Sequence, residues 1–173
     1  MKFLPLIIFI FCFFGCKRYE DPAPFTDPRI ANKYCNTPSA INYNWNFPGV
    51  PDSTTCIFPA EIFNGTYLFH DSIFNSVDTF LSSSTYPLTF DDIDTSHFNV
   101  TGFCTGITIK ATANRYFKFT IDTLVGNGQA LCLNDTISGK GSKNFITDTT
   151  IHLEFEVLND TGTVYHAGTA FKQ

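Results

Sequence analysis

Short runs in which apolar and polar residues alternate recur through the C-terminal part of the chain, and they constrain its fold more than any other feature. A period of two residues is the signature of a β-strand that buries one face. The clearest run covers residues 150–157, in which Ile151, Leu153 and Phe155 point to one face and Glu154 to the other. The chain is therefore expected to fold mainly as β-sheet.

Eight such runs are separated by turn signals, and we expect strands at residues 65–69, 86–90, 98–101, 107–111, 116–121, 136–141, 150–157 and 165–171. No segment of ten residues has a helical pattern, and only residues 59–63 favour a single helical turn that begins with proline. Consecutive strands joined by turns form an antiparallel meander, and eight of them can close so that no edge stays unpaired. The predicted fold is all-β, an antiparallel eight-stranded up-and-down barrel, with a two-layer β-sandwich as the alternative.

Composition excludes two classes of protein. The 173 residues are 43% hydrophobic and 16% charged, with a formal net charge of −5. A disordered chain would be richer in charge and poorer in aromatic residues. Binding to nucleic acid requires a basic face, so the acidic balance argues against that partner. A chain of this length and apolar content forms one folded domain with a core.

The N-terminus has the pattern of an export signal. Lys2 precedes a run of twelve apolar residues, which is too short to span a hydrocarbon core of roughly 30 Å as a helix. Gly15 and Cys16 follow, and the chain then becomes polar at once. This arrangement resembles a bacterial lipoprotein signal, in which the cysteine becomes the first mature residue and is acylated, with palmitate as the expected chain. An ordinary secretory signal with an incidental cysteine is the alternative.

These features predict the domain organisation and the location. Residues 1–15 are expected to be a lipoprotein signal peptide, and residues 16–58 a tether in which frequent prolines disfavour regular structure. The barrel domain is expected to cover residues 59–173. The expected location is the cell envelope, with a lipid anchor in the outer membrane and the periplasmic and cell-surface faces both open.

Four cysteines remain once the signal and Cys16 are set aside: Cys35, Cys56, Cys104 and Cys132. An even number in an exported chain predicts two disulfides, and three pairings are possible. Cys35–Cys56 would close a short loop in the tether. Cys104 follows the third strand and Cys132 follows the fifth, so both lie at the same rim of an up-and-down barrel and are expected to pair. No spacing of cysteine and histidine fits a zinc site.

Three short motifs carry a resemblance to a family. They are Gly-Thr-Tyr at residues 65–67, the run at residues 137–141 and the Gly-Thr-Ala-Phe-Lys run at residues 168–172. Together with the cysteine-anchored tether, they resemble the small lipocalin-like lipoproteins of Bacteroidota. The resemblance implies a lipocalin-like barrel of uncharacterised role, and it supplies no catalytic residues.

The interior of an eight-stranded barrel is either filled by its own side chains or keeps one small ligand site. The inward-facing residues that are candidates to line such a cavity are Tyr67, Phe69, Phe90, Ile109, Phe117, Phe119, Leu153 and Phe155. Small residues such as Gly139 and Gly141 would leave room or mark bends in the barrel. The pattern leaves both outcomes open.

Histidines form a constellation with possible metal chemistry. His70 ends the first predicted strand and His166 begins the last, so a closed barrel would bring both near one rim with Asp71 and Asp160. Two imidazoles and two carboxylates can hold zinc or copper. Solvated histidines at strand ends are the preferred interpretation, and no metal or other cofactor is predicted.

No nucleophile elbow, nucleotide-binding loop or catalytic triad is present, so an enzyme is not expected. Two other classes remain. The first is a non-catalytic binding module that takes a small apolar ligand or a protein partner. The second is a structural or accessory subunit of an outer-membrane complex, with no ligand of its own. An apolar cavity would favour the first class, and a filled interior with an exposed apolar patch would favour the second.

Overall fold

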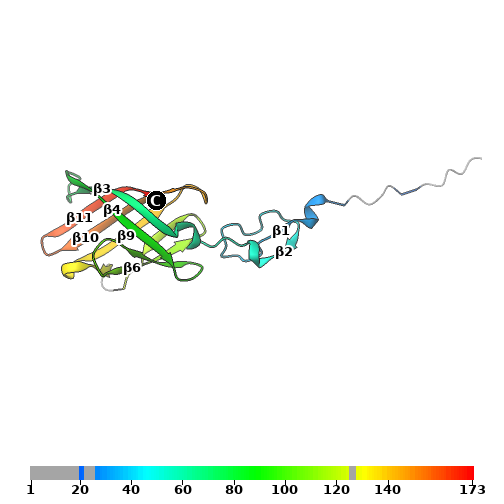
Figure 1. Ribbon diagram of the computed structural model, residues 1–173, viewed down its shortest axis with the longest axis horizontal. Helices are drawn as coiled ribbons and strands as arrows, with labels where there is room; N and C mark the ends of the chain where they lie inside the picture. The colour runs from blue at the N-terminus through cyan, green and yellow to red at the C-terminus, as the bar shows by residue number, and fades with distance from the viewer. Residues whose placement is uncertain (1–19, 22–25, 125–127) are drawn as a thin grey trace, which may run out of the picture.

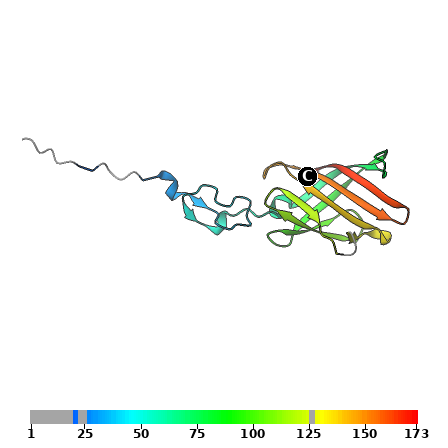
Figure 2. The ribbon, with the colours of Figure 1, turned by 180° about the vertical axis from the view of Figure 1, so that it is seen from behind.

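The computed structural model describes residues 20–21, 26–124 and 128–173, so the signal segment and Cys16 lie outside the described residues. Figures 1 and 2 show a β-barrel from which the N-terminal segment extends at one end. We call this end of the barrel proximal and the opposite end distal. The described part of the chain contains no helix long and apolar enough to cross a membrane.

Eight strands form the barrel wall. They are β3 (Gly65–Phe74), β4 (Phe80–Asp92), β5 (His97–Thr101), β6 (Thr108–Asn114), β7 (Lys118–Ile121), β9 (Thr136–Ser142), β10 (Thr150–Asn159) and β11 (Gly162–Lys172). Each strand is antiparallel to its neighbours in the chain, and β11 pairs with β3 to close the sheet. The short β8 (Gln129–Ala130) adds to β9. The predicted eight-stranded up-and-down barrel is therefore confirmed, and the sandwich alternative is wrong.

The strands differ in length, and one expected loop is part of the sheet. The alternation predicts strands that end at residue 69 and resume at residue 86, with a polar loop between them, but β3 continues to Phe74 and β4 begins at Phe80. Residues 80–85 are exposed on both faces, so they show no alternation that would have marked a strand. Because β5 pairs with β4 only over Thr89–Asp92, the long β3–β4 hairpin projects at the distal end.

Aromatic rings fill the proximal half of the barrel. Phe119 of β7 lies at ring-centroid distances of 5.0 Å from Phe63 and 5.1 Å from Phe98, both edge to face. Gly141 of β9 makes room for this packing, because a Cβ at that position would overlap the Phe119 ring. At Gly139 a Cβ would overlap the Cβ of Phe155 and the backbone of Glu154. The glycines of β9 therefore make room for the Phe119 ring and for the close approach of β10.

A single turn of 3-10 helix, η3 (Glu61–Phe63), closes the proximal end. Phe63 is fully buried there. The ammonium group of Lys143, a residue that is only 5% exposed, donates hydrogen bonds to the carbonyl oxygens of Ile62 at 2.7 Å and Asp148 at 2.8 Å. Burial, with a further contribution from the positive charge of Lys172, lowers the pKa of Lys143 to about 8. This lysine therefore fastens η3 to the barrel.

The N-terminal segment has local order of its own. η1 (Pro28–Ala31) precedes β1 (Lys33–Tyr34), which pairs in parallel with β2 (Val50–Pro51), and η2 (Ser53–Thr55) follows. The predicted disulfide Cys35–Cys56 is confirmed. The Asn42 side chain donates to the Thr55 carbonyl and accepts from the amide of Ile57. Residues 26–58 are thus cross-linked by one disulfide and one buried amide.

The pKa of Lys143 predicts a specific dependence of stability on pH. Between pH 8 and 10.5 the unfolded chain holds a proton on this lysine that the folded chain has lost. The free energy of unfolding should therefore rise with pH in this window, by at most about 1.4 kcal/mol per pH unit. Urea unfolding from about pH 7 to about pH 9.5 should show this slope in the wild type and not in Lys143→Met. The exposed Lys110→Met is the control and should keep the slope; equal slopes in wild type and Lys143→Met would contradict the prediction.

Candidate functional site

Two loops cover the distal mouth of the barrel. Residues 102–107 join β5 to β6, and residues 122–135, of which 125–127 are not described, join β7 to β9. The predicted disulfide Cys104–Cys132 links them and is confirmed. Phe103 packs edge to face on Phe155 at 5.1 Å. We call this pair of loops the distal cover.

A buried polar cluster lies on the inner face of the long strands. Asp71 of β3, which is 2% exposed, accepts hydrogen bonds on Oδ2 from Nδ1 of His166 at 2.8 Å and from the hydroxyl of Tyr86 at 3.2 Å. A carboxylate only accepts, so Nδ1 of His166 carries the hydrogen of this bond. Burial raises the pKa of Tyr86, and the charge of Asp71 and its hydrogen bond raise it further, so the phenol stays a donor.

One oxygen of this cluster has no partner. Both donors bind Oδ2 of Asp71, and Oδ1 is buried without a hydrogen bond among the described residues. Leaving a buried acceptor unpaired costs about 1–3 kcal/mol, and more when the group is charged. The protein therefore holds an under-satisfied carboxylate beside His166.

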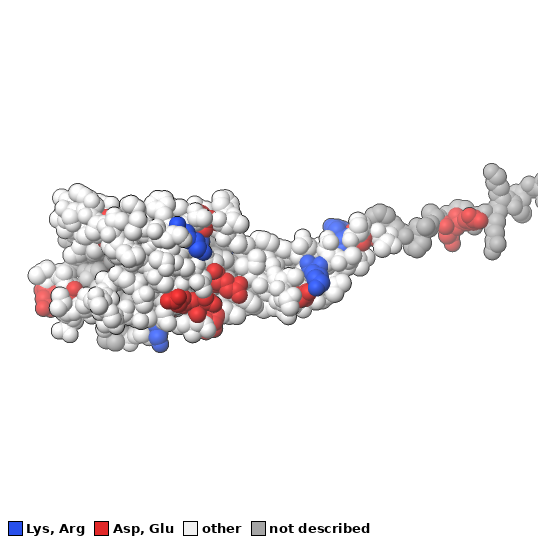
Figure 3. Space-filling view, in the orientation of Figure 1, with Lys and Arg blue, Asp and Glu red and all other residues white. Residues whose placement is uncertain are grey.

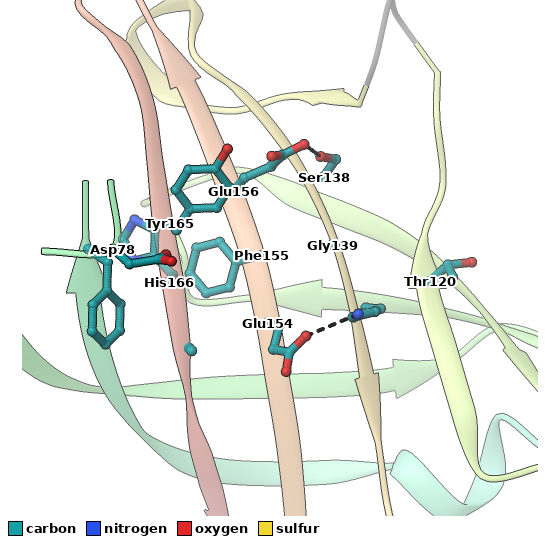
Figure 4. A pocket seen from close by; sticks show the side chains of 12 residues that line it. Asp78, Thr120, Ser138, Gly139, Glu154, Phe155, Glu156, Tyr165 and His166 are labelled. Carbon is teal, nitrogen blue, oxygen red and sulfur yellow. Dashed lines mark hydrogen bonds and ion pairs between the residues drawn. The ribbon is translucent and has the colours of Figure 1, made fainter. Parts of the chain in front are cut away.

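A cavity of about 690 Å³ lies against the distal half of the wall formed by β9, β10 and β11. His166 belongs both to this cavity and to the buried cluster, so it connects the two. Figure 4 shows the cavity with its lining side chains. The lining residues are Phe74, Asp78, Thr120, Ser138, Gly139, Lys140, Glu154, Phe155, Glu156, Tyr165, His166 and Ala167.

Strand alternation explains how the lining residues are placed. Glu154 and Glu156 are on the opposite face of β10 from the buried Phe155, and Tyr165 pairs in register with Glu156. The Phe155 ring stacks on the His166 ring with a centroid distance of 4.3 Å and an interplanar angle of 11°. The cavity is therefore bordered by residues from both faces of the wall.

The polar groups of the cavity are partly matched to one another. Lys140 forms an ion pair with Glu154 at 3.1 Å, and the hydroxyl of Ser138 donates to Glu156 at 2.8 Å. Both contacts appear as dashed lines in Figure 4. Aromatic walls with a few convergent polar groups are typical of small-molecule sites.

His70 and His166, which the sequence predicts to lie near one rim, are on opposite faces of the barrel wall. His70 is exposed and pairs in register with Thr169, whereas His166 points inward and binds Asp71. Asp160 lies in the turn between β10 and β11. The alternative in which these residues form one metal site is therefore wrong, because the barrel wall separates the two imidazoles. The preferred interpretation, solvated histidines, holds for the exposed His70 and not for His166. In the described ranges, no group of three metal-ligating side chains occurs.

The predicted cavity residues lie in different places. Phe155 lines the large cavity, and Phe119 borders a second cavity of about 300 Å³ that adjoins β7, β9 and β10. Phe117 is partly buried in the turn between β6 and β7. The other predicted cavity residues pack in the core: Tyr67, Phe69, Phe90, Ile109 and Leu153.

Sequence reasoning missed Asp71 and Tyr86 as members of an interior cluster. A signal for Asp71 was present, because it continues the inward series of Tyr67 and Phe69 at a spacing of two residues. The assignment of residues 70–85 to a loop ended that series too early. Tyr165 and Glu156 carried no comparable signal, because outward-facing residues of a strand are usually solvated.

No protein-family model matches the chain, and no curated protein matches it. The solved structures that are similar to this chain include the following two. One is the structure of EF1p2_mFAP2b bound to DFHBI, with 17% identity and a TM-score of 0.43, covering 66% of this chain and 97% of that one. The other is a mutant of the vaccine antigen transferrin-binding protein B from Haemophilus parasuis Hp5, with 13% identity and a TM-score of 0.36, covering 67% of this chain and 28% of that one. Neither similarity carries an argument about function.

The Asp71–His166 pair should be energetically coupled. We expect Asp71→Asn and His166→Gln each to lower the free energy of unfolding by about 1–3 kcal/mol, because each leaves a buried group without its partner. The double-mutant cycle should give a coupling energy of about 1–3 kcal/mol by urea unfolding. The exposed pair Asp94–His97, also at 2.8 Å, is the control and should couple by less than about 1 kcal/mol. Equal coupling in the two pairs would contradict the prediction.

Proposed function

We propose that the protein is an exported, lipid-anchored binding module whose distal cavity takes a small, largely apolar ligand. The observation that carries this proposal is the cavity of about 690 Å³ with aromatic walls. Pockets for small molecules have volumes of about 300–1,000 Å³ and combine apolar walls with a few oriented polar groups. The rings of Phe74, Phe155 and Tyr165 supply the apolar walls, and Glu156 and His166 supply polar groups.

The position of the cavity supports a tethered arrangement. The N-terminal segment leaves the barrel at the proximal end (Figure 1). The cavity is lined in part by Phe74 and Asp78, which lie at the distal end. In the proposed anchored protein, the chain would be attached through acylated Cys16, and the cavity would lie away from the membrane surface. Three acyl chains, each contributing about 0.8 kcal/mol per buried methylene, would make such an anchor effectively permanent.

The role of accessory subunit has one observation in its favour. Over residues 80–88, β4 pairs with β3 on one edge, and in the part of the chain that is described no strand pairs with the other edge. This stretch carries no charged residue, and charges are a common way to prevent edge pairing. An extended strand of an outer-membrane partner could add to this edge, as in other cases of β-augmentation.

Filling the cavity should abolish ligand capture. Ala167 lines the cavity, and Ala167→Trp should weaken binding of the neutral apolar dye Nile red at least about tenfold, because the indole occupies the space of the ligand. Fluorescence titration measures the affinity. Thr66→Trp places the same side chain on the outer face of β3 near the proximal end and is the matched control.

Native mass spectrometry of the protein purified from its own host provides the complementary measurement. We expect a retained small molecule in the wild type and in Thr66→Trp, and its loss in Ala167→Trp. A retained protein partner that is unaffected by Ala167→Trp and is released by Ser83→Pro would instead support the accessory role, because proline interrupts a strand edge. Equal affinity for Nile red in the wild type, Ala167→Trp and Thr66→Trp would contradict the cavity proposal.

The anchor makes a separate prediction. We expect Cys16→Ser to abolish incorporation of labelled palmitate and to move the protein from the membrane fraction to the soluble fraction. Cys12→Ser, which changes the other cysteine within residues 1–16, should leave labelling intact. Palmitate labelling of Cys16→Ser at the wild-type level would contradict an anchor at this position.

A further inference from the structure

We propose that the ligand of the distal cavity is a small organic amine, bound as its ammonium cation with its apolar body against the aromatic walls. The inference rests on the proposed function, since it names the chemical class that the same cavity selects. It follows from the balance of charge in the lining, from the direction of its hydrogen-bonding groups and from the identity of its walls.

The lining carries uncompensated negative charge. Lys140 is neutralised by Glu154 at 3.1 Å. Glu156 accepts a hydrogen bond only from the neutral Ser138 hydroxyl, and neither Glu156 nor Asp78 has a basic partner among the described residues. Figure 3 views the barrel from the side opposite this wall, and the charged atoms in view at the distal end, at the far left, are acidic there as well. An anionic ligand would therefore be repelled, and a cation would supply the missing charge.

The buried cluster places a carboxylate behind the wall. Asp71 has a side chain that is 1% exposed, and its carboxylate lies directly behind His166, which lines the cavity. A charge in a low-dielectric interior is screened much less than one at the surface. An ammonium group has three donors and no acceptor, so it matches the carboxylates of Glu156 and Asp78, which lack a basic partner among the described residues.

The walls suit a cation that has an apolar body. Tyr165 is 41% exposed and pairs in register with Phe74, which in turn contacts Phe80 edge to face at 6.0 Å. Aromatic faces attract cations by about 0.5–2 kcal/mol. The rings thus bury the apolar body of the ligand and also attract its charge. A neutral ligand of the same shape would gain the burial but not the attraction.

Three probes that share a phenyl ring separate the classes: phenethylamine, phenethyl alcohol and phenylpropionate. Isothermal titration calorimetry of the detergent-solubilised mature protein at neutral pH measures each affinity. We expect the amine to bind at least about tenfold more tightly than the alcohol, and the carboxylate to bind more weakly than either. The advantage of the amine should fall as salt is added.

Charge-neutralising variants test the residues. Glu156→Gln should reduce the affinity for phenethylamine about tenfold more than it changes the affinity for phenethyl alcohol. Asp78→Asn should also reduce the affinity for phenethylamine. Asp78 is exposed in the β3–β4 turn, so this substitution does not disturb a buried group. Asp91→Asn makes the same charge change at an exposed position of β4 near the proximal end and should change neither affinity.

The outcomes distinguish this inference from the proposed function. Equal binding of the amine and the alcohol, or tighter binding of the carboxylate, would overturn the ligand class while the cavity remained a binding site. Unchanged amine affinity in both Glu156→Gln and Asp78→Asn would also overturn it. If neither Nile red nor any of the three probes binds, the proposed function itself fails.

Discussion

The ladder between β11 and β3 is the interaction on which the rest of the structure depends. Its pairs run from Tyr165↔Phe74 to Lys172↔Tyr67, and they join the last strand of the chain to the first strand of the barrel. Closure satisfies the backbone groups that an open sheet would expose. The same ladder brings His166 beside Asp71, although 95 residues separate them in sequence. The wall and the buried cluster therefore arise from one set of backbone hydrogen bonds.

Unequal strand lengths divide the barrel into two halves with different roles. Where all eight strands are present, aromatic rings fill the interior, and the glycines of β9 leave space for this close packing. Lys143 fastens η3 over the proximal end. Where only the long strands continue, a disulfide-linked cover and a polar cluster take the place of a complete wall. Binding chemistry is concentrated in this second half, because a filled core has no room for a ligand.

Much of the fold was predictable because the signals were local. Period-two runs identified the eight strands, and the order of the loops around a closed meander predicted the Cys104–Cys132 pairing. Residues 80–85 were not recognised as strand, since both of their faces are exposed and no alternation exists there to detect. That single error also displaced the candidate site, because it moved His70 to a rim and hid the inward direction of Asp71.

The sequence by itself determined which face of most barrel strands is apolar, how many strands form the barrel and that four cysteines form two bridges. These properties follow from neighbouring residues and from chain order. Only the tertiary structure decided that Asp71, Tyr86 and His166 meet, and that Glu156 and Tyr165 border one cavity. The reason is that contacts between strands depend on register and on how far one strand extends past another. Both are set by long-range pairing that no local pattern records.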